Sequence, residues 1–151
     1  ILWQSYDFVN IPLDNSQMSP TFNQNEFYVG RRTITSENLI YGMVVYYDFP
    51  HSATRNRKDC LMFARVVGLP GDVIAMKSGK LYRNGKLIEE PYISKDNVSE
   101  ENYYDILVPK GYAYLLVDNR KRIKRDVYYK DSRCWGPILI TTIRGELKEK
   151  N

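Results

Sequence analysis

Apolar and aromatic residues along this chain gather in short runs, which are separated by clusters of Pro, Gly, Asn, Asp and Ser. Runs of this length, rich in Val, Ile and Tyr, favour strands over helices. The strands that we expect cover residues 6–11, 26–30, 43–48, 60–67, 72–77, 105–108, 112–117 and 138–143. Because these strands do not alternate with helical patterns, the sequence predicts an all-β domain.

Two turn sequences indicate where the expected strands reverse. In the segment 69–72, Pro70 presets φ for the second position of a turn, and Gly71 can take the positive φ of the third. The segment 81–88 is typical of a hairpin with Asn84-Gly85 as a type I′ turn. The polar segments are a loop at 12–21, a possible helical turn at 96–101 and a charged tail at 144–151 that we expect to be frayed.

The composition limits the classes of function. A chain of 151 residues with 43% hydrophobic residues suits one domain with a real core. The net charge of +4 comes with basic clusters at 55–58 and 121–125, which are either solvated loops or surfaces that attract an anionic membrane or an acidic partner. No recognition helix or aromatic stacking motif accompanies this charge, so nucleic acid is not an expected partner.

The chain offers few residues for metal or cofactor chemistry. Cys60 and Cys134 match no metal-binding spacing, and they form either a disulfide or two buried thiols. His51, the single histidine, stands in a polar loop without a partner placed near it. We therefore expect no metal and no cofactor.

Four segments carry a specific resemblance. They are Gln17–Thr21, Tyr41–Tyr46, Ala64–Asp72, and Val117–Arg120 together with Asp131–Gly136. In this order they are similar to the boxes Ser-Met-x-Pro-Thr, Gly-Asp-(Val/Ile)-Val, Lys-Arg-x-x-Gly-Leu-Pro-Gly-Asp and Gly-Asp-Asn-Arg…Ser-x-Asp-Ser-Arg…Gly. These boxes belong to the type I signal peptidases, which are membrane-anchored serine proteases that remove signal peptides. The chain resembles this family from about Phe8 to about Ile143.

The resemblance implies a mainly β, signal-peptidase-like fold. It implies a partly barrel-like core sheet in a single extracytoplasmic domain, residues 1–151, with a small inserted β subdomain at about 73–110. It also implies a membrane anchor that precedes this chain, at the outer face of the cell membrane. The apolar start Ile1-Leu2-Trp3 fits a stub of such an anchor beside the membrane interface.

The family's chemistry needs a serine nucleophile and a lysine base, and here the resemblance fails. Gln17 stands at the nucleophile's position and Ala64 at the base's position. A carboxamide does not attack a carbonyl usefully, and a methyl group accepts no proton. The serine that orients the lysine falls at Tyr129, and the oxyanion-hole hydroxyl falls near Asn15. The resemblance therefore implies a retained fold with degenerate catalytic positions.

Other matching residues are expected to be structural or to bind peptide. A polar network beneath the former site would comprise Asp118, Asn119, Arg120, Asp131 and Arg133. A peptide-binding groove would comprise Asn15, Ser16, Gln17, Met18, Pro20 and Ala64.

Three functions follow as hypotheses. The first is a non-catalytic accessory protein of Gram-positive pilus assembly, which binds an extended pilin or sortase segment by strand addition. The second is an active signal peptidase with an unusual nucleophile such as Ser16, although a shift of one residue points a side chain to the opposite side of an extended segment. The third is a relic whose groove is filled by its own aromatic side chains, namely Tyr46, Tyr47, Phe63 and Tyr129.

Overall fold

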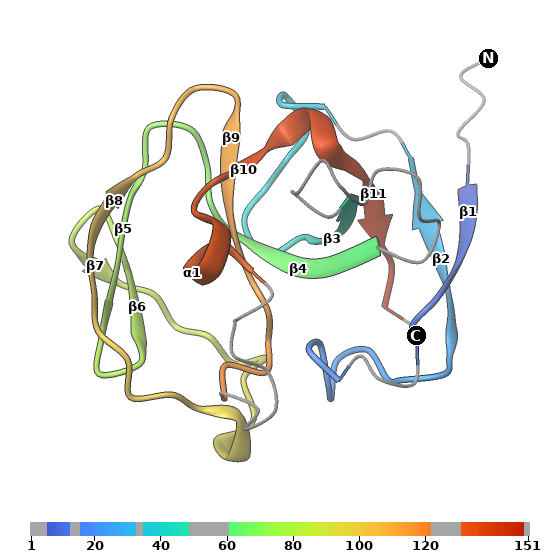
Figure 1. Ribbon diagram of the computed structural model, residues 1–151, viewed down its shortest axis with the longest axis horizontal. Helices are drawn as coiled ribbons and strands as arrows, with labels where there is room; N and C mark the ends of the chain where they lie inside the picture. Colours follow the sequence, from blue (N-terminus) through green and yellow to red (C-terminus); the bar gives the residue numbers. More distant parts are fainter. Residues whose placement is uncertain (1–5, 13–15, 33–34, 49–60, 122–130, 150–151) are drawn as a thin grey trace.

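The computed structural model describes residues 6–12, 16–32, 35–48, 61–121 and 131–149. In these ranges the chain forms two antiparallel sheets that lie side by side, together with short helical turns (Figure 1). Within the same ranges, no helix is long and apolar enough to span a bilayer. The expected mainly β fold is confirmed.

The larger sheet has seven strands in the order β1-β2-β11-β3-β4-β9-β10. Their bounds are β1 Tyr6–Asn10, β2 Phe27–Arg31, β11 Ile143–Leu147, β3 Val44–Asp48, β4 Leu61–Gly68, β9 Tyr112–Leu116 and β10 Ile138–Leu139. Among the described strands, β1 and β10 each have a single neighbour, so this sheet is open and does not close into a barrel. The apolar strand β3 is buried and lies between β11 and β4, as its Val-Val-Tyr-Tyr sequence favours.

The smaller sheet has four strands in the order β7-β6-β5-β8. Their bounds are β7 Lys86–Leu87, β6 Lys80–Arg83, β5 Val73–Lys77 and β8 Tyr103–Leu107. All four strands fall between β4 and β9, which are neighbours in the larger sheet. The segment of about 73–110 that we expect to be an insertion therefore contains the whole smaller sheet.

Both expected turns have the predicted backbone conformation. Gly71 has φ +90°, and the Asp72 N–H donates to the Leu69 carbonyl at 3.0 Å. Asn84 and Gly85 have φ of 53° and 78°, the two positive values that a type I′ turn requires.

The C-terminal segment differs from the expectation. The single strand expected at 138–143 is divided into β10, a 3₁₀ turn at Ile140–Thr142 and the start of β11. The tail expected to be frayed contains most of β11, which lies inside the larger sheet between β2 and β3. Pairing with strands far away in the sequence stabilises this charged segment, and a local pattern does not report such pairing.

The helical turns also differ slightly from the sequence pattern. The expected turn at 96–101 is a 3₁₀ turn at Lys95–Asn97. The short helix α1, Ser132–Trp135, was not expected, and Asp131 caps it by accepting from the Arg133 N–H. A cap of this kind is visible in sequence only as a lone Asp.

Two glycines allow Tyr46 to cross the larger sheet. A Cβ atom on Gly30 of β2 would lie 2.6 Å from the Tyr46 hydroxyl, and a Cβ atom on Gly145 of β11 would also overlap it. The Tyr46 side chain is 1% exposed and its hydroxyl donates to Asp7 of β1 at 2.9 Å. Tyr46 therefore ties β3 to the edge strand β1, over two strands that carry glycine where the ring passes.

Candidate functional site

The loop at residues 16–22 carries Gln17 and follows β1 in the chain. The Phe22 N–H donates to the Met18 carbonyl at 2.9 Å, and the Gln17 side chain is buried. Two contacts from other parts of the chain hold this loop. The Asn119 N–H donates to the Gln17 carbonyl at 2.8 Å, and the Asn97 amide donates to the Ser19 carbonyl at 3.0 Å.

Asp118 joins this loop to the larger sheet. Its carboxylate accepts from Nε of Arg65 at 2.8 Å and from Nη2 of Arg65 at 2.6 Å, a bidentate pair. It also accepts from the Thr21 hydroxyl at 2.7 Å, and its own N–H donates to the Met18 sulfur at 3.4 Å. The Asp118 side chain is fully buried, so one carboxylate fixes both the loop and β4.

Ala64 precedes Arg65 on β4 and is fully buried opposite Val45 of β3. Met18 contacts the Asp118 backbone N–H and Arg65 contacts the Asp118 carboxylate, so Gln17 and Ala64 are each one residue away from a partner of the same residue. Met18 and Ala64 also share one hydrophobic cluster. The structure thus brings together the two chain segments that carry Gln17 and Ala64, the positions expected from the resemblance to be degenerate.

Serine hydroxyls in this loop have no base beside them in the described part of the chain. There, no hydrogen bond joins the hydroxyl of Ser16 or of Ser19 to a lysine or histidine. Tyr129, Asn15 and His51 lie outside the described residues, as does Cys60 of the possible disulfide. Across the described residues, no cluster of His, Cys, Asp and Glu could hold a metal ion.

A second group of buried charges supports the site from the other side. Asp131 accepts from the Val117 N–H at 3.0 Å and from Nη2 of Arg133 at 2.9 Å. Arg133 in turn donates to the Arg120 carbonyl at 3.1 Å. The Arg120 guanidinium forms a bidentate pair with Glu90, with distances of 3.1 and 2.5 Å. Three of the five residues expected in the polar network, Asp118, Asn119 and Arg120, lie in the segment that follows β9. The other two, Asp131 and Arg133, form hydrogen bonds with that segment.

Tyr92 connects this group to Arg65. The Arg65 guanidinium lies 4.0 Å above the centre of the Tyr92 ring, and the Tyr92 hydroxyl donates to Glu90 at 2.5 Å. Burial, with the negative charge of Glu90 next, raises the pKa of the Tyr92 hydroxyl, which therefore stays protonated as a donor. The segment that connects β7 to β8 is thus packed on the site's main ion pair.

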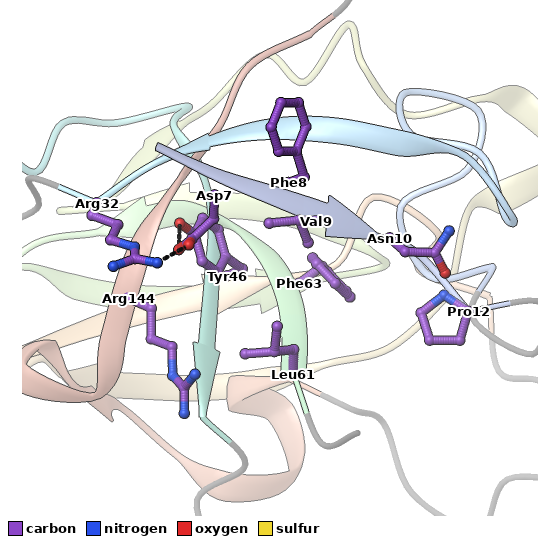
Figure 2. Close-up of a pocket in the computed structure, with 10 residues that line it drawn as sticks. All are labelled: Asp7, Phe8, Val9, Asn10, Pro12, Arg32, Tyr46, Leu61, Phe63 and Arg144. Carbon is purple, nitrogen blue, oxygen red and sulfur yellow. Dashed lines mark hydrogen bonds and ion pairs between the residues drawn. The ribbon is translucent and has the colours of Figure 1, made fainter. Parts of the chain in front are cut away.

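A cavity of about 760 Å³ lies between β1 and the first half of β4 (Figure 2). Its lining residues are Asp7, Phe8, Val9, Asn10, Pro12, Arg32, Tyr46, Leu61, Phe63 and Arg144. Among the described strands β1 pairs only with β2, and β4 pairs with β9 only from Arg65 onward. Within the described part of the chain, both walls of the cavity therefore belong to strand segments with one edge that pairs with no other strand.

The groove that we expect from the sequence and this cavity have different linings. Met18 and Ala64 are completely buried, Ser16 is half-buried and Pro20 is exposed, and none of them lines the cavity. The residues that do line it, other than Tyr46 and Phe63, went unnoticed in the sequence. The available signal was the position of Phe8, an aromatic residue on the outward face of the first expected strand, which is 84% exposed.

Comparisons with known proteins agree on one family. The family model described as "Signal peptidase, peptidase S26" matches residues 1–150. Signal peptidase I V of Bacillus subtilis (strain 168) is 28% identical over 155 residues, which cover 94% of this chain and 84% of that protein. Signal peptidase I of Bacillus caldolyticus is 28% identical over 152 residues, covering 93% and 77%. The crystal structure of a signal peptidase I from Enterococcus faecalis V583 has a TM-score of 0.56 at 24% identity and covers 74% of this chain and 97% of that chain, a likeness of fold.

Proposed function

Since the chain belongs to the signal peptidase family, peptidase S26, we propose that it is a non-catalytic member that binds an extended peptide without cutting it. The observation that carries this proposal is the pair of residues Gln17 and Ala64 at the two positions where the family's dyad would stand. Neither side chain supplies a nucleophilic oxygen or a proton acceptor, and removing both members of a catalytic pair removes the mechanism.

The open cavity supports peptide binding. A peptide strand placed between β1 and the residues 61–64 of β4 would find backbone donors and acceptors on both sides, because both edges lack a strand partner in the described chain. The apolar side chains of Val9, Leu61 and Phe63 would cover alternate side chains of that peptide. Tyr46 and Phe63, two of the aromatic residues expected to fill a groove, line this space without filling it.

We assign the peptide to a pilin or to the sortase that polymerises pilins, at the outer face of the cell membrane, with an anchor outside this chain. This assignment rests on the resemblance to signal-peptidase-like proteins of Gram-positive pilus assembly. In this role the protein would hold an extended segment of its partner in the cavity between β1 and β4.

The decisive experiment measures cleavage and binding together. The protein is incubated with fluorescent peptides that span a pilin signal-peptide junction, an inner pilin segment and a sortase segment. We expect no hydrolysis over a day and saturable binding of a pilin or sortase segment, followed by fluorescence anisotropy. Scrambled peptides of the same composition are the matched control.

The rival function is an active signal peptidase, and the same experiment detects it. Hydrolysis that disappears in Ser16→Ala but persists in Ser19→Ala would overturn the non-catalytic assignment. The double variant Gln17→Ser with Ala64→Lys provides a positive control, because it restores the nucleophile and base at the family's two positions.

A further inference from the structure

One end of the cavity carries charge, and the other does not. Asp7, Arg32, Tyr46 and Arg144 gather at that end, whereas Asn10 and Pro12 lie at the opposite end (Figure 2). The charged residues come from different parts of the larger sheet. Asp7 is on β1, Arg32 follows β2, and Arg144 is on β11. The sheet's pairing therefore builds this cluster out of segments that are distant in sequence.

The carboxylate in this cluster is already occupied. Arg32 donates to Oδ1 of Asp7, and the Tyr46 hydroxyl donates to Oδ2 at 2.9 Å. These contacts, the Arg32 hydrogen bond foremost, hold the pKa of Asp7 below its usual range, so this carboxylate is ionised and turned toward its own partners. Both oxygens of Asp7 thus already accept a hydrogen bond, and Arg32 balances its charge.

The two guanidinium groups, by contrast, keep donors for a ligand. Arg32 and Arg144 have side chains that are 54% and 55% exposed. In the described part of the chain each has one ion-pair partner, contacted through Nη2: Asp7 for Arg32, and Asp48 at 2.7 Å for Arg144. A guanidinium carries five N–H donors, so each of these cavity-lining arginines keeps donors that its ion pair does not use. Asp48 is not among the lining residues, so the described residues give the cavity wall two cations and one paired anion.

The apolar part of the cavity lies at a defined distance along β1 from the charged end. Val9 stands two residues after Asp7 on β1, a distance of about 7 Å along a strand. A peptide strand that lies along β1 also presents alternate side chains to one face at that spacing. An apolar side chain against Val9 and Phe63 would therefore place the side chain two positions away at the charged end.

We propose that this cavity selects a peptide segment with an acidic side chain two positions from an apolar one, with Arg32 and Arg144 binding the acid. This inference rests on the proposed peptide-binding function and adds the class of segment that the site accepts. The carboxylate can come from an Asp or Glu side chain or from a free C-terminus, because both offer the same two acceptor oxygens.

The test uses a set of acetylated decapeptides, each with Leu at one position and Glu, Gln or Lys two positions away. Each peptide is made with an amidated and with a free C-terminus, and binding is measured by anisotropy at low and high salt. We expect the Glu peptide to bind roughly tenfold more tightly than the Gln peptide, the difference made by one charge-assisted contact, and the Lys peptide to bind least. The preference should shrink in high salt, because both arginines are partly exposed.

Variants assign the preference to the two arginines. Arg144→Gln should remove most of the Glu-over-Gln preference, and Arg144→Glu should reverse it in favour of Lys. Arg32→Gln alone would leave the Asp7 carboxylate without its arginine, and that negative charge would itself repel an acidic peptide. The double variant Arg32→Gln/Asp7→Asn removes both charges, so it isolates the contribution of Arg32 to recognition. Lys80→Gln, an exposed lysine on β6 outside the cavity lining, is the matched control and should leave the preference unchanged.

The outcomes separate the two levels of the proposal. If no peptide binds, including the neutral ones, the peptide-binding function itself is wrong, and this inference is wrong with it. If Glu, Gln and Lys peptides bind equally, or if Arg144→Glu keeps the original order, peptide binding stands and acid selection is overturned. Preference for a free C-terminus over internal Glu in the same variants would identify the terminal carboxylate as the ligand.

Discussion

Asp118 is the residue whose loss should damage this site most, because it holds a full negative charge without exposure to water. Its carboxylate faces the Arg65 guanidinium at 2.6 and 2.8 Å, and the two side chains are 0% and 7% exposed. Asp118→Asn keeps the shape and removes the charge, so the Arg65 cation remains buried without its counter-ion. Breaking one side of a buried pair of this kind typically costs about 3–5 kcal/mol.

This cost translates into a large thermal shift. Unfolding entropy of about 2.1 cal/mol/K per residue gives about 0.3 kcal/mol/K for a chain of 151 residues. The Asp118→Asn protein should therefore melt about 10–15 °C below the parent in differential scanning calorimetry. Asp105→Asn, an exposed carboxylate on β8, is the matched control, and it should stay within about 2 °C of the parent.

A double-mutant cycle isolates the ion pair from the other contacts. In an Arg65→Met background the buried cation is gone, so Asp118→Asn should cost much less than it does alone. The argument is refuted if Asp118→Asn has the same melting temperature as the Asp105→Asn control. It is also refuted if Asp118→Asn lowers the free energy of unfolding by the same amount in the Arg65→Met background as in the parent. Either result would mean that packing, and not this charge pair, joins the Gln17 loop to β4.

Three further changes test other parts of the structure. Gly145→Ala should destabilise the protein by about 1–3 kcal/mol in urea unfolding, because the added methyl overlaps both the Tyr46 hydroxyl and the Arg31 carbonyl oxygen; an unchanged midpoint would show that the ring and β2 both shift at no cost. Burial raises the pKa of Asp72, but the Tyr41 hydroxyl and two further donors outweigh it and leave the pKa lowered. The stability that the Asp72 carboxylate contributes is therefore present above its unfolded pKa and is lost as pH falls through the lower folded value. The difference in free energy of unfolding between the parent and Asp72→Asn, measured by urea unfolding, should therefore shrink below about pH 4. Phe8→Ala should weaken peptide binding in calorimetry while leaving the melting temperature unchanged, since the ring is 84% exposed at the cavity; equal affinity would remove Phe8 from the binding surface.

The strands and turns could be predicted because their causes are local. The Asn84-Gly85 and Pro70-Gly71 turns depend on φ preferences that each residue carries with it, and both adopt the expected backbone. β11 could not be predicted as an interior strand, because its Arg144 and Glu146 indicate a surface segment and only pairing with β2 and β3 overrides that pattern.

The candidate site also has a part that the sequence predicts and a part that depends on the fold. The residues around Asp118 could be foreseen because they fall in recognisable boxes, although their pairing with particular partners depends on the fold. The cavity could not be foreseen, since its walls are the first and fifth strands of the sheet order and no local pattern reports that they face each other. Asp7 and Arg32 lie near the start of the chain and Arg144 near its end, and each alone resembles an ordinary surface charge.

These contacts also explain how a chain can match the boxes of a protease family with Gln17 and Ala64 at the two positions that the resemblance assigns to the reaction. Asp118, Arg120, Asp131 and Arg133 are buried or paired, and their removal would leave orphaned charges whatever the protein does. Stability alone is therefore a sufficient reason for their presence, and the match they produce carries little information about catalysis. The chemical information in the boxes is concentrated at residues 17 and 64, where a side chain can change from serine or lysine to another type without breaking the Asp118 junction. A restored Gln17→Ser/Ala64→Lys protein that folds as stably as the parent would support this separation of scaffold from chemistry, and one that fails to fold would refute it.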